Sequence, residues 1–103
     1  VYLIRRSQKG LLGGMRGLPT TEWLSAPWTE ETALAAAPVA AAYQDAGIVR
    51  HVFTHFPLAL QVYAAPAPEG FTGEGEWVRL EDELGLPTVF AKALERGLAA
   101  LQP

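Results

Sequence analysis

Two histidines, two phenylalanines and a threonine fall within six consecutive residues, from His51 to Phe56. An imidazole gains charge near neutral pH and hydrogen-bonds in either protonation state, and a hydroxyl both donates and accepts. An aromatic ring beside them can insert between stacked bases or pack in a core. The four-residue spacing of His51 and His55 suits a metal pair on a helix, but this stretch is predicted to be a strand. The two histidines are therefore not a specific metal signal, and the residue types alone do not separate base recognition from core packing.

The basic residues are unevenly distributed. Residues 1–20 carry four basic side chains and no acid, whereas residues 69–83 carry six acids and one arginine. The net charge of −3 argues against a free-standing nonspecific DNA-binding protein, because that affinity comes mainly from neutralising phosphates. One end of the molecule can face phosphate while the other faces solvent, although an ordinary solvated surface with uneven charge fits equally well.

The composition limits the class of protein. A chain of 103 residues, half of them hydrophobic, is expected to fold as one domain. The absence of cysteine excludes disulfides, thiolate metal sites and iron–sulfur clusters from this polypeptide. No apolar run is long enough to span a bilayer and no secretion signal is visible, so we expect a soluble cytoplasmic protein with no membrane partner. The missing initiator methionine indicates a fragment of a longer protein.

Hydrophobic periodicity predicts five strands, at residues 1–5, 15–19, 48–56, 58–64 and 76–80. The first has apolar residues on both faces and is expected to be central. The second is a short return strand after a glycine-rich loop. The third and fourth are expected to pair as a hairpin or as neighbours, because a single proline separates them.

Two short helices and one longer helix are predicted. Thr29 is a plausible N-cap for an alanine-rich helix that Pro38 ends, and Pro38 fits the first turn of a second helix through Tyr43. The last helix opens at Thr88 with an apolar stripe at helical spacing, made of Val89, Phe90, Ala93, Leu94, Leu98 and Leu101. The order of the elements predicts an α+β domain with a mixed or antiparallel sheet.

Two motifs resemble the C-terminal domain of MutY-type adenine DNA glycosylases. They are the run Lys9-Gly10-Leu11-Leu12-Gly13-Gly14 and the segment Phe53-Thr54-His55-Phe56. Leu86-Pro87-Thr88 also opens the last helix as in that family. The resemblance covers nearly the whole chain and implies a single Nudix-like domain over residues 1–103, the C-terminal fragment of a longer glycosylase. One departure is Arg16-Gly17, where family members usually have tryptophan and an acid.

The resemblance implies a DNA-lesion reader. The family removes adenine mispaired with 8-oxoguanine, and its recognition loop carries phenylalanine, serine or threonine, and histidine, here Phe53, Thr54 and His55. 8-Oxoguanine has a proton on N7, where guanine has an acceptor, so discrimination requires an acceptor near N7. The Thr54 hydroxyl can supply it, Phe53 can insert beside the lesion, and His55 can donate to a phosphate or to the base. The expected partner is double-stranded DNA containing 8-oxoguanine opposite adenine.

Five further residues are predicted to support DNA binding: His51, Arg50, Arg5, Arg6 and Lys9. The four basic side chains are candidates for phosphate contacts on charge alone. Residue type alone also fits a different interpretation, in which Phe53 packs in the core and His55 is a surface or capping residue. The resemblance to the glycosylase family favours lesion recognition over core packing for these residues.

The resemblance places the glycosidic chemistry elsewhere. Family members carry it on an N-terminal helical domain with an acid pair and usually an iron–sulfur cluster, and nothing in this chain matches those motifs. We therefore expect no catalytic residue and no cofactor in this fragment. It would act in cis with the catalytic domain, in the bacterial cytoplasm at the nucleoid.

A hydrolase and a docking module remain as alternatives. The Nudix hydrolase motif aligns with Gly17, Glu22 and Glu31, but Leu34 and Ala35 replace its two metal-binding glutamates. A hard cation needs such a carboxylate cluster, so no metal site is predicted. The third hypothesis is a protein–protein docking module on the same fold, with exposed Trp23 or Trp28 as its anchor.

Overall fold

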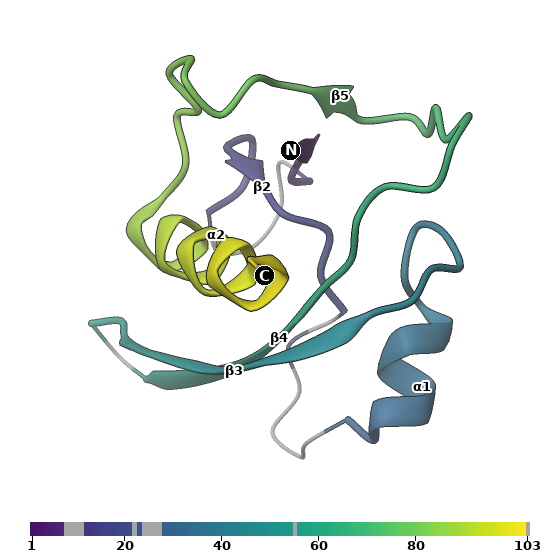
Figure 1. Ribbon diagram of the computed structural model, residues 1–103. Helices are drawn as coiled ribbons and strands as arrows, with labels where there is room; N and C mark the ends of the chain where they lie inside the picture. The colour runs from purple at the N-terminus through teal and green to yellow at the C-terminus, as the bar shows by residue number, and fades with distance from the viewer. Residues whose placement is uncertain (8–11, 22, 24–27, 55, 103) are drawn as a thin grey trace.

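A single long helix, α2 (Thr88–Leu101), lies between a two-stranded hairpin and a smaller three-stranded sheet (Figure 1). The structure is a computed structural model that describes residues 1–7, 12–21, 23, 28–54 and 56–102. The described strands pair antiparallel throughout, so the predicted α+β class is confirmed. No helix in the described ranges is long and apolar enough to cross a membrane.

The three-stranded sheet is built around β1 (Tyr2–Arg5). This strand lies between β2 (Arg16–Gly17) and β5 (Glu76–Trp77), which confirms its predicted central place. Leu3 is fully buried. Both flanking strands are shorter than the predicted 15–19 and 76–80.

The hairpin consists of β3 (Gln44–Val52) and β4 (Pro57–Ala64). Strand β3 begins before the predicted residue 48 and ends before residue 56. It ends early because the chain turns back, with the Phe53 N–H donating to the Phe56 carbonyl at 2.9 Å. A bulge between Asp45 and Gly47 interrupts the register, and Gly47 has a φ of 91°, a backbone conformation that favours glycine.

The predicted helix from Pro38 to Tyr43 is wrong, because this segment has bends and no regular secondary structure. In a helix the Val39 carbonyl would accept from the Tyr43 N–H. Here it accepts from the Tyr43 hydroxyl at 2.8 Å, while the Tyr43 N–H donates to the Ala41 carbonyl at 3.0 Å. The segment thus leads directly into β3.

The two remaining helices begin where the sequence predicts. Helix α1 (Glu30–Ala35) is capped by Thr29, whose hydroxyl accepts from the Thr32 N–H at 3.2 Å. Helix α2 begins at Thr88 and covers one face of the hairpin. Gly97 allows close approach there, because a Cβ at this position would lie 3.3 Å from the Ala64 Cβ.

The main core lies between α2 and the hairpin. It consists of Val49 and Val62 from the hairpin and Val89, Phe90 and Ala93 from α2. Alternation along each strand directs one set of side chains into this core and the other set outward. On the outer face Ile48 is 40% exposed and Val52 is 78% exposed. In the described part of the chain, the inner face of the hairpin therefore carries its buried core contacts.

Candidate functional site

The segment singled out by residue type forms the end of the β3–β4 hairpin, which projects beyond α2 (Figure 1). Thr54 is exposed at this turn, whereas Phe53 is half-buried. His55 lies outside the described residues, as does Lys9. The hairpin end therefore presents a threonine hydroxyl to solvent directly beside an anchored aromatic ring.

Four aromatic side chains form a contiguous group at this end, which we call the tip cluster: Trp23, His51, Phe53 and Phe56. The His51 ring meets Phe53 edge-on with centroids 4.7 Å apart, and Phe56 lies 5.1 Å from Phe53. Trp23 lies 6.1 Å from Phe53 on the core side. These separations are typical of favourable aromatic pairs. Phe53 thus packs against the core and also takes part in the exposed tip, while Phe56 is 40% exposed.

Arg6 supports the tip cluster from inside the molecule. Its guanidinium carbon lies 4.6 Å from the ring centroid of Trp23 and 5.3 Å from that of Phe90, within cation–π range. Burial lowers the pKa of Arg6 from its ordinary value. An arginine nonetheless stays charged, so a cation is held beneath the aromatic rings. Arg6 therefore contacts aromatic neighbours, and its predicted contact with phosphate stays a prediction.

A glycine makes this stacking possible. A Cβ at Gly17 would lie 3.1 Å from the Phe90 ring and 3.3 Å from the Arg6 side chain. Both contacts are tighter than ordinary van der Waals packing. Gly17 and Trp23 were missed as contributors to the site, because nothing local in the sequence predicts that either residue meets Arg6.

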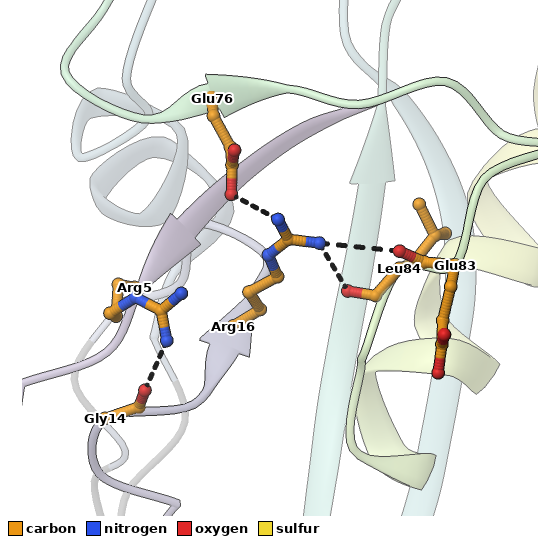
Figure 2. Close-up of polar contacts among 6 residues, drawn as sticks. All are labelled: Arg5, Gly14, Arg16, Glu76, Glu83 and Leu84. Atoms are coloured by element: carbon orange, nitrogen blue, oxygen red, sulfur yellow. Dashed lines mark hydrogen bonds and ion pairs between the residues drawn. The ribbon is translucent and has the colours of Figure 1, made fainter.

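The neighbouring Arg5 points to a different place. Its Nη1 donates to the Gly14 carbonyl at 2.8 Å (Figure 2). The same view shows Arg16 joined to Glu76 at 2.8 Å and to the carbonyl oxygens of Glu83 and Leu84 at 3.5 and 3.2 Å. Arg16, at the departure from the family pattern, therefore cross-links β2, β5 and the loop before α2.

Arg50 also lies apart from the tip cluster. It is exposed and next to His51, so alternation places it on the opposite side of β3. The structure thus brings His51, Phe53 and Thr54 together with Arg6, which joins them through Trp23. It does not bring Arg5 or Arg50 into contact with them.

The acids of the hydrolase motif do not gather. Glu30 and Glu31 are exposed on the six-residue helix α1, and Glu22 lies outside the described residues. Within the described ranges no three metal-ligating side chains come together. Burial raises the pKa of Tyr63, and the charges of Glu30 and Asp45 raise it further. These acids therefore act at the base of the hairpin, at the end away from Thr54.

The family model described as the NUDIX domain matches residues 1–96, nearly the whole chain. No curated protein and no solved structure matches the chain.

Proposed function

The chain belongs to the NUDIX domain family, and we propose that within it this chain is a non-catalytic domain that reads 8-oxoguanine opposite adenine in duplex DNA. The observation that carries the proposal is the hairpin end, where exposed Thr54 adjoins the packed ring of Phe53. A polar group that reads a base edge must stand beside a surface that accepts the base. Thr54 and the tip cluster provide both.

The chemistry of reading follows from the donors and acceptors at the tip. The Phe53 N–H is already donated to the Phe56 carbonyl, so it does not compete for the base. Among the residues that the structure describes, the Thr54 hydroxyl has no hydrogen-bond partner, so it can accept a hydrogen bond from the N7–H that distinguishes 8-oxoguanine from guanine. Because a hydroxyl also donates, selectivity needs a second acceptor, and backbone carbonyl groups of the turn are the candidates.

Phe53 supplies the apolar part of recognition. Inserting a side chain at a base step costs a few kcal/mol of unstacking, which aromatic contact partly offsets. Trp23 and His51 hold the Phe53 ring on two sides, so little side-chain entropy remains to be lost on binding. A pre-positioned ring of this kind suits a wedge or a platform beside the lesion.

The proposal extends to the parent protein. We propose that the domain belongs to a MutY-type adenine DNA glycosylase of the bacterial cytoplasm, with a catalytic domain in cis that carries any iron–sulfur cluster. A linker to that domain raises the effective concentration at the lesion, so this domain need not bind DNA tightly alone. A negative net charge is compatible with such a tethered role.

The two alternatives have less support. Leu34 and Ala35 stand where a Nudix hydrolase needs carboxylates to hold a hard cation. For the docking module, Trp23 is not an exposed anchor, because it is half-buried against Phe53 and Phe90. Trp28, at 38% exposed, is the better anchor for that hypothesis.

The deciding experiment is an amide NMR titration of the 103-residue chain with two duplexes that differ only in 8-oxoguanine or guanine opposite adenine. We expect lesion-dependent shifts centred on residues 51–56, and their loss in Phe53→Ala and in Thr54→Val. Phe71→Ala is the matched control, because it removes a ring from a different cluster. Equal responses to both duplexes in the unmodified chain would refute lesion reading by this domain.

A further inference from the structure

The cationic side chains of the described part of the chain fall into two groups. Arg5, Arg6 and Arg16 are engaged with carbonyl groups, aromatic rings or a carboxylate. Four others make no hydrogen bond or ion pair with the residues that the structure describes: Arg50, Arg79, Lys92 and Arg96. A cation without a protein partner is available to an anionic ligand.

Three of these four cations line one shallow groove of about 690 Å³. Arg50 enters it from β3, and Lys92 and Arg96 enter it from α2, one helical turn apart and therefore on one helix face. The bulge positions Arg96, since a Cβ at Gly47 would meet its Nη1 at 2.7 Å. The small side chains of Ala46, Ala99 and Ala100 keep the groove open.

Two acids share the groove, and one of them is engaged. The Asp45 Oδ1 accepts from the Gly47 N–H at 2.8 Å and from the Gln61 Nε2 at 2.6 Å. Glu95 is exposed on α2 between the two cations of that helix. The groove keeps an excess of positive charge in a chain whose net charge is −3. This local reversal of sign is what a phosphate-binding surface requires.

We propose that this groove binds phosphates of the DNA backbone whose lesion lies at the hairpin end. The identity of the anion as duplex DNA rests on the proposed function. Arg50 lies two residues before the end of β3 at Val52, so this side of the groove is close to the hairpin end. A DNA strand that leaves the hairpin end along the edge of β3 would then meet the groove that these three cations line.

The test separates backbone binding from lesion reading. Binding of the chain to 8-oxoguanine and guanine duplexes is measured by fluorescence anisotropy over a series of salt concentrations. Each of Arg50→Gln, Lys92→Gln and Arg96→Gln is expected to reduce the slope of log K against log salt by about 0.9, and to weaken both duplexes equally. Arg79→Gln is the matched control, an exposed cation outside the groove, and should leave the slope unchanged. Glu95→Gln should strengthen binding to both duplexes.

Failure of the groove and failure of the proposed function give different results. Unchanged slopes in all three groove variants, or losses of affinity equal to that of Arg79→Gln, would refute phosphate binding by the groove. Altered slopes without any preference for 8-oxoguanine would support phosphate binding by the groove and refute lesion reading. Thermal unfolding of each variant verifies that the fold is retained.

Discussion

The molecule has two clusters of aromatic rings that look alike by composition and differ in what surrounds them. Tyr2, Phe71 and Trp77 form the second cluster, with centroid separations of 5.0 to 5.8 Å, close to those of the tip cluster. The Tyr2 hydroxyl of this cluster is used internally, because it accepts from the Gly75 N–H at 2.6 Å. The tip cluster instead has the Arg6 guanidinium stacked on Trp23, whereas an exposed threonine adjoins a ring in both clusters, Thr54 beside Phe53 and Thr72 beside Phe71. Aromatic content therefore does not identify a site, whereas the stacked cation distinguishes the two clusters.

The largest effect on stability is expected from a substitution where the tip cluster packs against the core. Phe90 is fully buried and lies beneath both Arg6 and Trp23. Phe90→Ala leaves a cavity and is expected to reduce the free energy of unfolding by about 3–5 kcal/mol in urea denaturation. Phe71→Ala, at the partly exposed second cluster, should cost clearly less. Equal losses would show that the tip cluster is no better anchored than the second one.

A smaller effect is expected from overpacking the second cluster. A Cβ at Gly75 would overlap the Leu3 carbonyl oxygen and the Tyr2 ring. Gly75→Ala should therefore destabilise the protein by about 1–3 kcal/mol and leave the response of residues 51–56 to DNA unchanged. Thr72→Ala, in the same exposed loop, should stay within about 0.5 kcal/mol of the unmodified chain. A lost DNA response in Gly75→Ala would show that the two clusters are coupled.

The cation of the tip cluster can be tested by two parallel substitutions. Arg6→Lys keeps the charge but loses the planar group that stacks on Trp23, and should cost about 0.5–1 kcal/mol. It should also change the ring-current shifts of Phe53 and Phe56 in the free protein. Among the described residues, Arg5 contacts only a carbonyl group, so Arg5→Lys should leave those shifts unchanged. Identical spectra for the two variants would refute the role of Arg6 beneath the rings.

The smallest effect on stability is expected at Tyr63, near the end of the hairpin opposite to the tip cluster. The pKa of Tyr63 is raised in the folded protein by burial and by Glu30 and Asp45. The folded state therefore favours the neutral phenol, and this contribution to stability is present below the ordinary tyrosine pKa near 10 and is lost as pH rises through the folded value. Tyr63→Phe should therefore reduce the loss of stability above about pH 10. Urea denaturation at a series of pH values measures this loss. Tip-cluster shifts that follow the same titration would contradict the separation of the two ends.

Features that depend on local chemistry were predictable from the sequence. The Thr29 cap, the start of α2 at Thr88 and the central place of β1 all follow from residues near one another in the chain. The helix from Pro38 to Tyr43 was mispredicted, because a tyrosine hydroxyl took the carbonyl that a helix would have used. Local periodicity cannot reveal such competition.

The candidate site was predictable only in part, for the same reason. The turn after Val52 and the exposure of Thr54 lie within the segment that residue type singled out. The support beneath it required Gly17, Trp23 and Phe90 to meet Arg6, across three separate parts of the chain. The predicted phosphate contact by Arg6 stays untested, and its partly buried guanidinium stacks on the rings of Trp23 and Phe90.

The cross-link made by Arg16 has a consequence for how the domain tolerates sequence drift. Two of its three partners are backbone carbonyl groups, at Glu83 and Leu84. Every amino acid offers the same carbonyl, so the side chains at these two positions can diverge among descendants of this gene while the loop stays fastened to β2. Only Arg16 and its carboxylate partner, Glu76, must keep their residue types for the ion pair to form. A loop that varies freely in sequence can thus keep a fixed path into α2.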